Sequence, residues 1–244
     1  MRAATAVVTN AGHMERLEEV EREARERLYP SLTNPSWLVL RRRREIFQKW
    51  IAQLGTHKLD VLDLGGRIQP YRPLLAGRVR RYLAVDLRQT PLVNVVARGE
   101  QIPLASERFD LVICTQMLEY IPEPAVVIAE IHRVLRPGGC LFLSVPAASV
   151  RDAEEDAWRF LPAALRQLLA VFSQSEIVSE GSSLIGFFRT VNVCLSTFLR
   201  YQALRTVYLW TICPLLNLCG ELLEHLASSN NDQFTPNYSA WAQK

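Results

Sequence analysis

The sequence lacks the patterns that mark several specialised classes of protein. Its five cysteines form no C-x-x-C pair and no cluster with histidine, so neither a metal site nor a disulfide framework is expected. Its 28 basic and 25 acidic side chains nearly balance, which leaves too little excess positive charge for a nucleic-acid-binding face. It has no uninterrupted apolar run of about 20 residues, the length that a membrane-spanning helix needs.

The N-terminus also lacks the charged and then apolar layout of a signal peptide, so a cytoplasmic protein is expected. The longest strongly apolar stretch is Val207–Leu218, which Pro214 interrupts. Packing in a core or an interface is the favoured interpretation of this stretch, and peripheral contact with a membrane is the alternative. No pattern in the sequence indicates an oligomeric state.

The middle of the chain alternates between strand and helix patterns. The strands read as nearly unbroken apolar runs, which predicts a parallel sheet covered by helices on both faces. The fold class is therefore α/β: a Rossmann-like, doubly wound, mostly parallel seven-stranded sheet. In this region the expected strands are Leu59–Leu64, Arg81–Val85, Asn94–Ala97, Phe109–Thr115 and Cys140–Val145, and the expected helices are Pro70–Ala76 and Pro124–Leu135.

Segments on both sides complete this domain. Residues 1–55 are expected to form a loose tail over residues 1–12 and two cap helices, and residues 56–244 the main domain, in which residues 147–226 form a substrate-side loop and helical insertion. The expected elements are helices at His13–Leu28, Trp37–Leu54 and Trp158–Val171, a strand at Ser175–Ser179, an apolar helical insertion at Thr190–Leu226 and an antiparallel edge strand at Asn237–Ala242. The run Arg41–Arg44 is interpreted as a solvated helix face, with contact to an anionic ligand or a lipid headgroup as the alternative.

Two features at the ends of the first two strands indicate a ligand site. The first strand stops at Gly65-Gly66, and glycines there permit positive φ and close approach of a ligand to the backbone. Asp86 ends the second strand about 20 residues later, where a carboxylate can accept hydrogen bonds from a ribose. The alternatives are a βα turn without a ligand and a helix-capping role for Asp86.

Together with Leu118-Glu119 and Arg133–Gly139, these features make the chain resemble the class I S-adenosylmethionine-dependent methyltransferases, in particular the type 11 group. The resemblance covers roughly Leu59–Pro146. It implies the transfer of a methyl group from S-adenosylmethionine to an oxygen or nitrogen of an acceptor. A weaker resemblance, at Trp158-Arg159-Phe160, is to methyltransferases of glycan assembly, which makes a glycan or a lipid-linked sugar one candidate acceptor beside a small molecule.

The resemblance also implies roles for individual residues. Asp63 and Gly65, with Gly66 and Arg67, match the loop around the methionine end of the cofactor, and Asp86 matches the residue that holds the ribose. Further positions match the surroundings of the adenine (Gln101, Ile102) and of the methionine moiety (Thr115, Gln116). No general base is implied, and the candidates from loop position are Glu119, Tyr120 and Asp156.

The chain departs from the family pattern at three places in the same pocket. Arg67 and Gln69 stand where the family has glycines, Arg98 stands where it usually has an aspartate, and Tyr120 replaces a histidine. Arg67 is expected either to pair with the carboxylate of the cofactor or to block the pocket. The alternative function is therefore a catalytically inactive methyltransferase-like scaffold or binding protein.

Overall fold

The computed structural model describes residues 10–151, 153–227 and 231–244, with side chains from Leu17 onward. One sheet has the strand order β3-β2-β1-β4-β5-β7-β6, and within the described ranges β7 is the one strand that runs antiparallel to the rest. The predicted doubly wound, mostly parallel seven-stranded sheet is confirmed. The strands are β1 (Leu59–Leu64), β2 (Val79–Asp86), β3 (Val95–Val96), β4 (Phe109–Thr115), β5 (Leu135–Pro146), β6 (Gln174–Ser179) and β7 (Asn237–Gln243).

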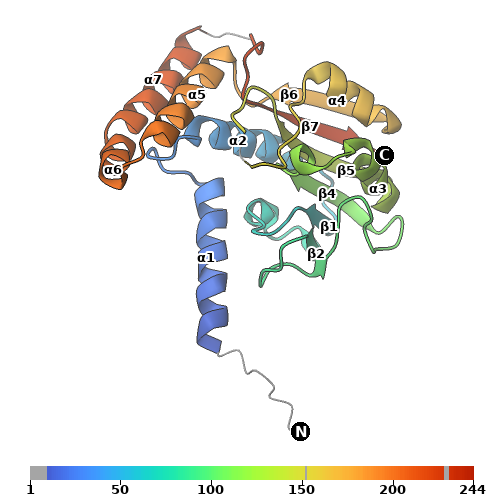
Figure 1. The fold of residues 1–244 in the computed structure, drawn as a ribbon. Helices are drawn as coiled ribbons and strands as arrows, with labels where there is room; N and C mark the ends of the chain where they lie inside the picture. Colours follow the sequence, from blue (N-terminus) through green and yellow to red (C-terminus); the bar gives the residue numbers. More distant parts are fainter. Residues whose placement is uncertain (1–9, 152, 228–230) are drawn as a thin grey trace.

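Helices cover both faces of this sheet and add a separate lobe (Figure 1). The lobe consists of the last three α-helices, which lie together beside α2, whereas α1 extends away from the sheet. The α-helices are α1 (Asn10–Leu28), α2 (Trp37–Gln53), α3 (Pro124–Val134), α4 (Pro162–Leu168), α5 (Ser183–Phe198), α6 (Gln202–Trp210) and α7 (Ile212–Ala227), and the short 3-10 helices are η1 (Arg72–Leu75), η2 (Leu118–Tyr120) and η3 (Leu169–Val171).

The apolar core has two main layers, one on each face of the sheet. On one face, β1, β4 and β5 pack against α3 and α4 through side chains such as Leu62, Ile131 and Leu165. On the other face, the same strands pack against α2, where Phe47 contacts Phe142 with ring centroids 5.5 Å apart. Strands buried on both faces explain why the sequence reads there as apolar runs rather than as an alternating pattern.

The strand register brings the carboxyl ends of four strands to one edge. Leu64 of β1 pairs with Val85 of β2 on one side and with Cys114 of β4 on the other. Thr115, at the end of β4, pairs with Ser144 of β5. The residues that follow β1, β2, β4 and β5 therefore meet at this edge, which is where open α/β sheets bind ligands.

Several helices are shorter than the sequence predicts. The helix expected over Pro70–Ala76 is only the 3-10 turn η1, because a segment this short, with prolines at both 70 and 73, cannot sustain an α-helix. The helix expected from Trp158 begins at Pro162. The backbone N–H of Trp158 is 3.3 Å from the carbonyl of Glu119, and that of Phe160 donates to Pro146, so this segment is extended.

The C-terminal part contains two larger differences. The strand β7 is antiparallel as predicted, but it is not an edge strand: it lies between β5 and β6, and β6 forms the edge. The helical insertion starts at Ser183 rather than Thr190, because the Ser182 hydroxyl caps α5 by accepting a hydrogen bond from the backbone N–H of Leu184 at 3.1 Å. Residues 1–9 of the expected tail lie outside the described residues, and α1 already begins at Asn10.

Candidate functional site

The turn after β1 is built from backbone that only small residues allow. Gly65 has φ 77°, and a Cβ placed on it would lie 3.2 Å from the Met117 side chain. A Cβ on Gly66 would lie 2.7 Å from Asp63. The same Met117 side chain approaches Gly99 from the other side, at 3.1 Å from a Cβ built there. The turn above β1 is thus formed by glycine backbone, and the flexible apolar side chain of Met117 lies against it.

Beneath this turn lies a buried carboxyl group. Asp63 is almost fully buried, and the Tyr82 hydroxyl donates a hydrogen bond of 2.6 Å to its Oδ2. The pKa of Asp63 is raised to about 7, mainly by burial; the Tyr82 hydrogen bond opposes this shift and the charge of Asp86 adds to it. Asp63 therefore supports the turn from beneath, and it lines neither of the two cavities at this edge of the sheet.

The other residues predicted to bind the cofactor do not all lie at the same place. Asp86 is half-buried at the tip of β2, and its Oδ1 accepts a hydrogen bond of 2.8 Å from the backbone N–H of Arg88. Thr115 is half-buried at the tip of β4. Ile102 belongs to the core instead, since its N–H is tied to Glu130 of α3, and Gln101 beside it is exposed. The chain thus places Asp86 and Thr115 at the crest and Ile102 below it.

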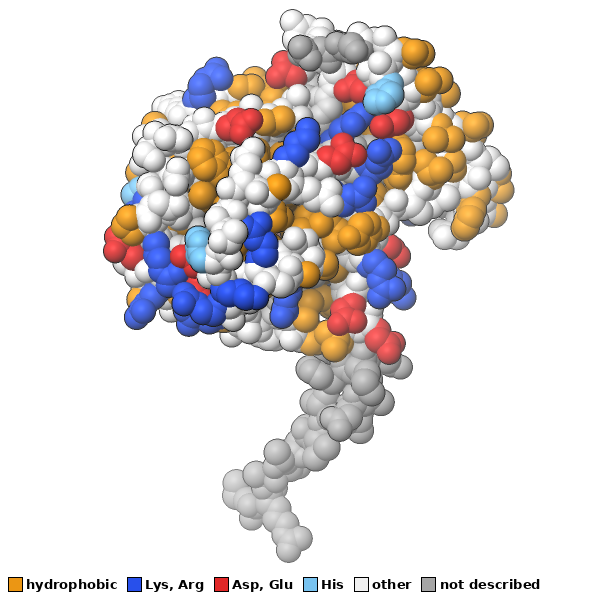
Figure 2. Space-filling model, turned by 180° about the vertical axis from the view of Figure 1, so that it is seen from behind, with side chains coloured by type: hydrophobic (Ala, Val, Ile, Leu, Met, Phe, Trp, Pro, Cys, Tyr) orange, Lys and Arg blue, Asp and Glu red, His pale blue; other side chains and the backbone are white. Residues whose placement is uncertain are grey.

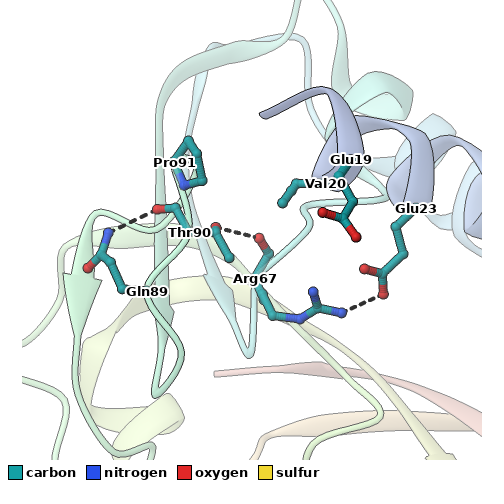
Figure 3. A pocket seen from close by; sticks show the side chains of 7 residues that line it. All are labelled: Glu19, Val20, Glu23, Arg67, Gln89, Thr90 and Pro91. Atoms are coloured by element: carbon teal, nitrogen blue, oxygen red, sulfur yellow. Dashed lines mark hydrogen bonds and ion pairs between the residues drawn. The ribbon is translucent and has the colours of Figure 1, made fainter. Parts of the chain in front are cut away.

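A cavity of about 450 Å³ opens between α1 and the loops that follow β1 and β2, and we call it the α1 cavity (Figure 3). Arg67 points out of the glycine turn toward α1 and forms an ion pair with Glu23. Its backbone carbonyl accepts a hydrogen bond of 2.8 Å from Thr90, which joins the two loops. The arginine side chain thus lines this cavity beside α1. The lining residues are Glu19, Val20, Glu23, Arg67, Gln89, Thr90 and Pro91.

A second cavity of about 440 Å³ lies above the carboxyl ends of β4 and β5, and we call it the Glu119 cavity. Helices α2 and α5 contribute to its wall, and the carboxylates of Glu119 and Asp156 and the phenol of Tyr120 also line it. Glu23 lines this cavity as well as the α1 cavity. The Arg67–Glu23 ion pair therefore stands between two adjoining spaces at the crest of the sheet. Of the residues predicted for the cofactor, Gln116 lines the Glu119 cavity.

The carboxyl group of Glu119 at this site is buried and incompletely hydrogen-bonded. The residue is 4% exposed, and Oε2 is buried without a hydrogen-bond partner in the described part of the chain. The pKa of Glu119 is raised to about 7, mainly by burial. Its own backbone N–H and the guanidinium groups of Arg43 and Arg159 oppose this shift, and the carboxylate of Asp156 adds to it. A carboxyl that titrates near neutrality can exchange a proton with a ligand in the cavity.

The neighbouring candidates have structural partners. Asp156 is paired with Arg159, whose Nη2 lies 2.8 Å from Asp156 Oδ2. Backbone N–H groups of Ala157 and Trp158 reach the Glu119 carbonyl at 2.8 and 3.3 Å, and the Trp158 indole donates to Ile121 at 2.8 Å. This segment therefore closes over η2 and buries Glu119. Asp156 holds that segment in place.

A buried ion pair under the Glu119 cavity has no counterpart in the sequence analysis. Arg43, expected on a solvated face, is 2% exposed and binds Glu180 through Nε and Nη2, each at 2.9 Å. Glu180 also accepts hydrogen bonds from the hydroxyls of Ser144 (2.5 Å) and Ser239 (2.6 Å). The pair anchors α2 to the ends of β5, β6 and β7. Four identical arginines in a row gave no signal as to which one would be buried.

Part of the chain is similar to known methyltransferases. The model of the methyltransferase domain family matches residues 62–143. The ubiquinone biosynthesis O-methyltransferase of Pseudomonas aeruginosa (strain UCBPP-PA14) is 40% identical over 102 residues, which are 41% of this chain and 39% of that protein. The corresponding enzyme of Hahella chejuensis is 35% identical over the same share of this chain and 38% of its own length. The chain thus spans about two fifths of these relatives.

Solved structures with low identity share the fold. Phosphoethanolamine N-methyltransferase 2 of Haemonchus contortus, in complex with S-adenosyl-L-methionine, has a TM-score of 0.53 at 14% identity over 91% of this chain and 60% of that chain. The 1,6-didemethyltoxoflavin-N1-methyltransferase of Burkholderia thailandensis has a TM-score of 0.51 at 16% identity over 100% and 93% of the two chains. A [4+2]-cyclase, SpnF, has a TM-score of 0.52 at 16% identity over 82% and 80%. The shared fold alone therefore does not determine the reaction, which depends on the residues of the site.

Proposed function

We propose, from the premise that this chain carries a class I S-adenosylmethionine-dependent methyltransferase domain, that it transfers a methyl group to a phenolic hydroxyl of a small acceptor. The observation that carries the proposal is the buried, unpartnered Oε2 of Glu119, a residue that lines a cavity which shares Glu23 with the α1 cavity beside Arg67. S-adenosylmethionine, when bound, supplies a methyl group that the positive charge of the sulfonium activates.

The residues at the crest fit this cofactor. The bare backbone of Gly65 and Gly66 allows a ligand to approach closely, and Met117 can pack against an apolar or aromatic surface. Asp86 offers Oδ2, which has no hydrogen-bond partner among the described residues, to the hydroxyls of a ribose. Arg67 can exchange Glu23 for the carboxylate of the cofactor, since the two anions present the same geometry to a guanidinium. Thr115 lies at the tip of β4, the strand that pairs with β1.

The proposed role of Glu119 is to take the proton of the acceptor. Proximity and alignment account for most of the catalysis when the methyl group is already activated, and a hydroxyl nucleophile gains further from a positioned base. With a pKa of about 7, Glu119 is ionised in a large fraction of molecules at neutral pH. Its buried environment excludes water that would otherwise compete for the proton. Tyr120 and Asp156 line the same cavity and help to position the acceptor.

The chemistry of the base favours a phenol over a sugar alcohol as acceptor. A phenolic hydroxyl has a pKa near 10, about three units above that of Glu119. The aliphatic hydroxyl of a sugar alcohol is less acidic than a phenol, and water, for comparison, has a pKa near 15.7. Proton transfer to Glu119 is therefore far less costly from a phenol. The two relatives that are similar in sequence, from Pseudomonas aeruginosa and Hahella chejuensis, are O-methyltransferases, which supports an oxygen acceptor over a nitrogen one. Neither of them is named for a glycan or a lipid-linked sugar.

The experiment is a methyl-transfer assay with methyl-labelled S-adenosylmethionine against three acceptor types: catechol-type phenols, primary amines and sugar alcohols. The expected result is transfer to phenols, with kcat rising through pH 7 as Glu119 ionises. Glu119→Gln should lower kcat by roughly 10²-fold or more and abolish the inflection, with an unchanged Kd for the cofactor. Glu155→Gln, on the exposed loop nearby, is the matched control. Persistence of the inflection in Glu119→Gln contradicts the role of this base.

A second candidate is a catalytically inactive scaffold. It is favoured by Gln69, which stands at a position of positive φ (50°) where the family has glycine, and by the engagement of Arg67 with Glu23. A scaffold of this kind keeps the fold and binds no cofactor. Absence of heat on titration with millimolar S-adenosylmethionine supports the scaffold, and saturable binding supports the enzyme.

A further inference from the structure

The lobe formed by α5, α6 and α7 exposes an unusual amount of apolar surface. Figure 2 shows hydrophobic side chains gathered on this lobe, at the upper right of the view. Phe198, Tyr201 and Trp210 are 77, 75 and 73% exposed. The other exposed large apolar side chains of α6 and α7 are Leu204, Val207, Ile212, Leu215, Leu218, Leu222, Leu223 and Leu226. Contiguous apolar surface on this scale marks a place where another molecule or a membrane binds.

Charge is segregated across the same helices. No residue of 206–220 is Asp, Glu, Lys or Arg. The two acidic residues of α7 turn toward the body of the protein, where Glu221 pairs with Arg41 and Arg42 and Glu224 binds Ser182. Arg200 and Arg205, which are exposed and adjoin Tyr201 and Leu204 in the sequence, have no acidic partner among the described residues. The outer surface is therefore apolar with a cationic rim.

The lengths of α6 and α7 exclude that these helices cross a membrane. The segment Gln202–Ala227 contains an 18-residue window with a mean hydropathy of 1.3 and is the one described segment long and apolar enough to cross a membrane. Thr211 (φ −120°, ψ −70°) breaks it into α6 and α7. The longer part, α7, has 16 residues and reaches only about 24 Å, less than the roughly 30 Å of a hydrocarbon core. Moreover, Cys213, Asn217 and Gly220 of α7 are buried inside the domain.

We propose that the exposed face of α6 and α7 docks on an anionic phospholipid bilayer, with its apolar and aromatic side chains at interfacial depth and Arg200 and Arg205 against the headgroups. Tryptophan and tyrosine favour the boundary between water and lipid, and basic side chains beside an apolar face strengthen binding to anionic lipids. A second copy of this chain fits less well, because a twofold contact would place this rim of arginines against itself without acidic partners.

Docking at this face also places the Glu119 cavity near the membrane. Arg189 and Val193 of α5 line that cavity, and the same helix ends at Phe198 beside the docking face. An apolar acceptor dissolved in the bilayer then needs to travel only along α5. This consequence rests on the proposed function, whereas the docking itself does not: a chain that binds vesicles but no cofactor leaves the docking intact.

The test is flotation of the full chain with vesicles of phosphatidylcholine alone or mixed with phosphatidylglycerol. Binding to the mixed vesicles, with a blue shift of fluorescence that Trp210→Phe removes, is expected. Leu215→Glu with Leu222→Glu should lower the partition coefficient by at least about tenfold. Arg200→Gln and Arg205→Gln should each lower it by about fivefold on anionic vesicles only. Far-UV circular dichroism and thermal unfolding report whether each variant is folded.

The matched control adds the same two charges elsewhere on the surface. Leu161→Glu with Val171→Glu alters side chains that are 61 and 50% exposed at α4 and η3. This control should bind vesicles like the unaltered chain. The proposal is overturned if the unaltered chain does not float with anionic vesicles, or if both double variants lose binding equally. It is also overturned if the chain is a dimer that Leu215→Glu with Leu222→Glu dissociates and that does not bind lipid.

Discussion

The buried carboxyl of Asp63 makes the stability of the fold depend on pH in a way that one substitution should remove. In the unfolded chain this group titrates near 3.9, whereas burial raises its pKa in the folded chain to about 7. Between these values the folded chain keeps a proton that the unfolded chain has released. The stabilising contribution is therefore fully present below about pH 4 and is lost as the pH rises through 7.

The magnitude follows from the same two values. A difference of about three pKa units corresponds to roughly 4 kcal/mol in the free energy of unfolding, which is an upper limit because buried groups relax on ionisation. Asp63→Asn cannot ionise, and its amide oxygen can still accept the hydrogen bond of the Tyr82 hydroxyl. The variant should match the unaltered chain near pH 4 and exceed its stability at pH 8 by up to this amount.

Urea denaturation followed by circular dichroism, at intervals between pH 4 and pH 8, measures this difference directly. Glu155→Gln removes an exposed carboxyl from a loop and should leave the pH dependence unchanged. A stability difference between Asp63→Asn and the unaltered chain that stays constant over the pH range refutes the reasoning, because it shows that Asp63 does not titrate there.

Three further substitutions test the ion pairs and the packing around the site. Glu180→Gln leaves the buried guanidinium of Arg43 without a carboxylate, so the free energy of unfolding in urea should fall by about 3–5 kcal/mol; a loss below about 1 kcal/mol contradicts a buried pair. Gly186→Ala would place a Cβ 1.7 Å from the Phe234 carbonyl oxygen, so Tm should fall by the equivalent of about 2 kcal/mol or more, and an unchanged Tm shows that this contact is absent. Glu23→Gln frees Arg67 from its ion pair. Because half-exposed ion pairs contribute at most about 1 kcal/mol, the Kd for S-adenosylmethionine in calorimetry should fall by no more than about fivefold. A rise in Kd would mean that Glu23 supports binding.

The strands at the centre of the sheet were predictable because burial on both faces leaves a direct mark on the sequence. The predicted bounds Leu59–Leu64 and Phe109–Thr115 agree with β1 and β4. The order of strands at the far edge was not predictable, since no local signal says that β7 inserts between β5 and β6. The start of α5 could have been found, because Ser182 is a typical N-cap ahead of an apolar helical pattern.

The site was predictable where it follows the strand ends and not where it depends on packing. The glycine turn and Asp86 lie at the crest as expected, because parallel strands share one carboxyl edge. Glu119 was only one of three equal candidates, and its burial depends on the segment around Trp158 closing over it. The Arg43–Glu180 pair joins residues 137 positions apart, and nothing local to either residue indicates the other.

Calorimetric titration of the full chain with S-adenosylmethionine tests most directly whether this crest is a cofactor site. Saturable binding is expected, and Asp86→Ala should weaken it by about tenfold or more, because a charge-assisted hydrogen bond to a ribose contributes about 1.5–3 kcal/mol. Glu155→Ala should bind like the unaltered chain. No heat at millimolar ligand, or an unchanged Kd in Asp86→Ala, contradicts the assignment of the carboxyl edge of β1 and β2 as the place where the cofactor binds.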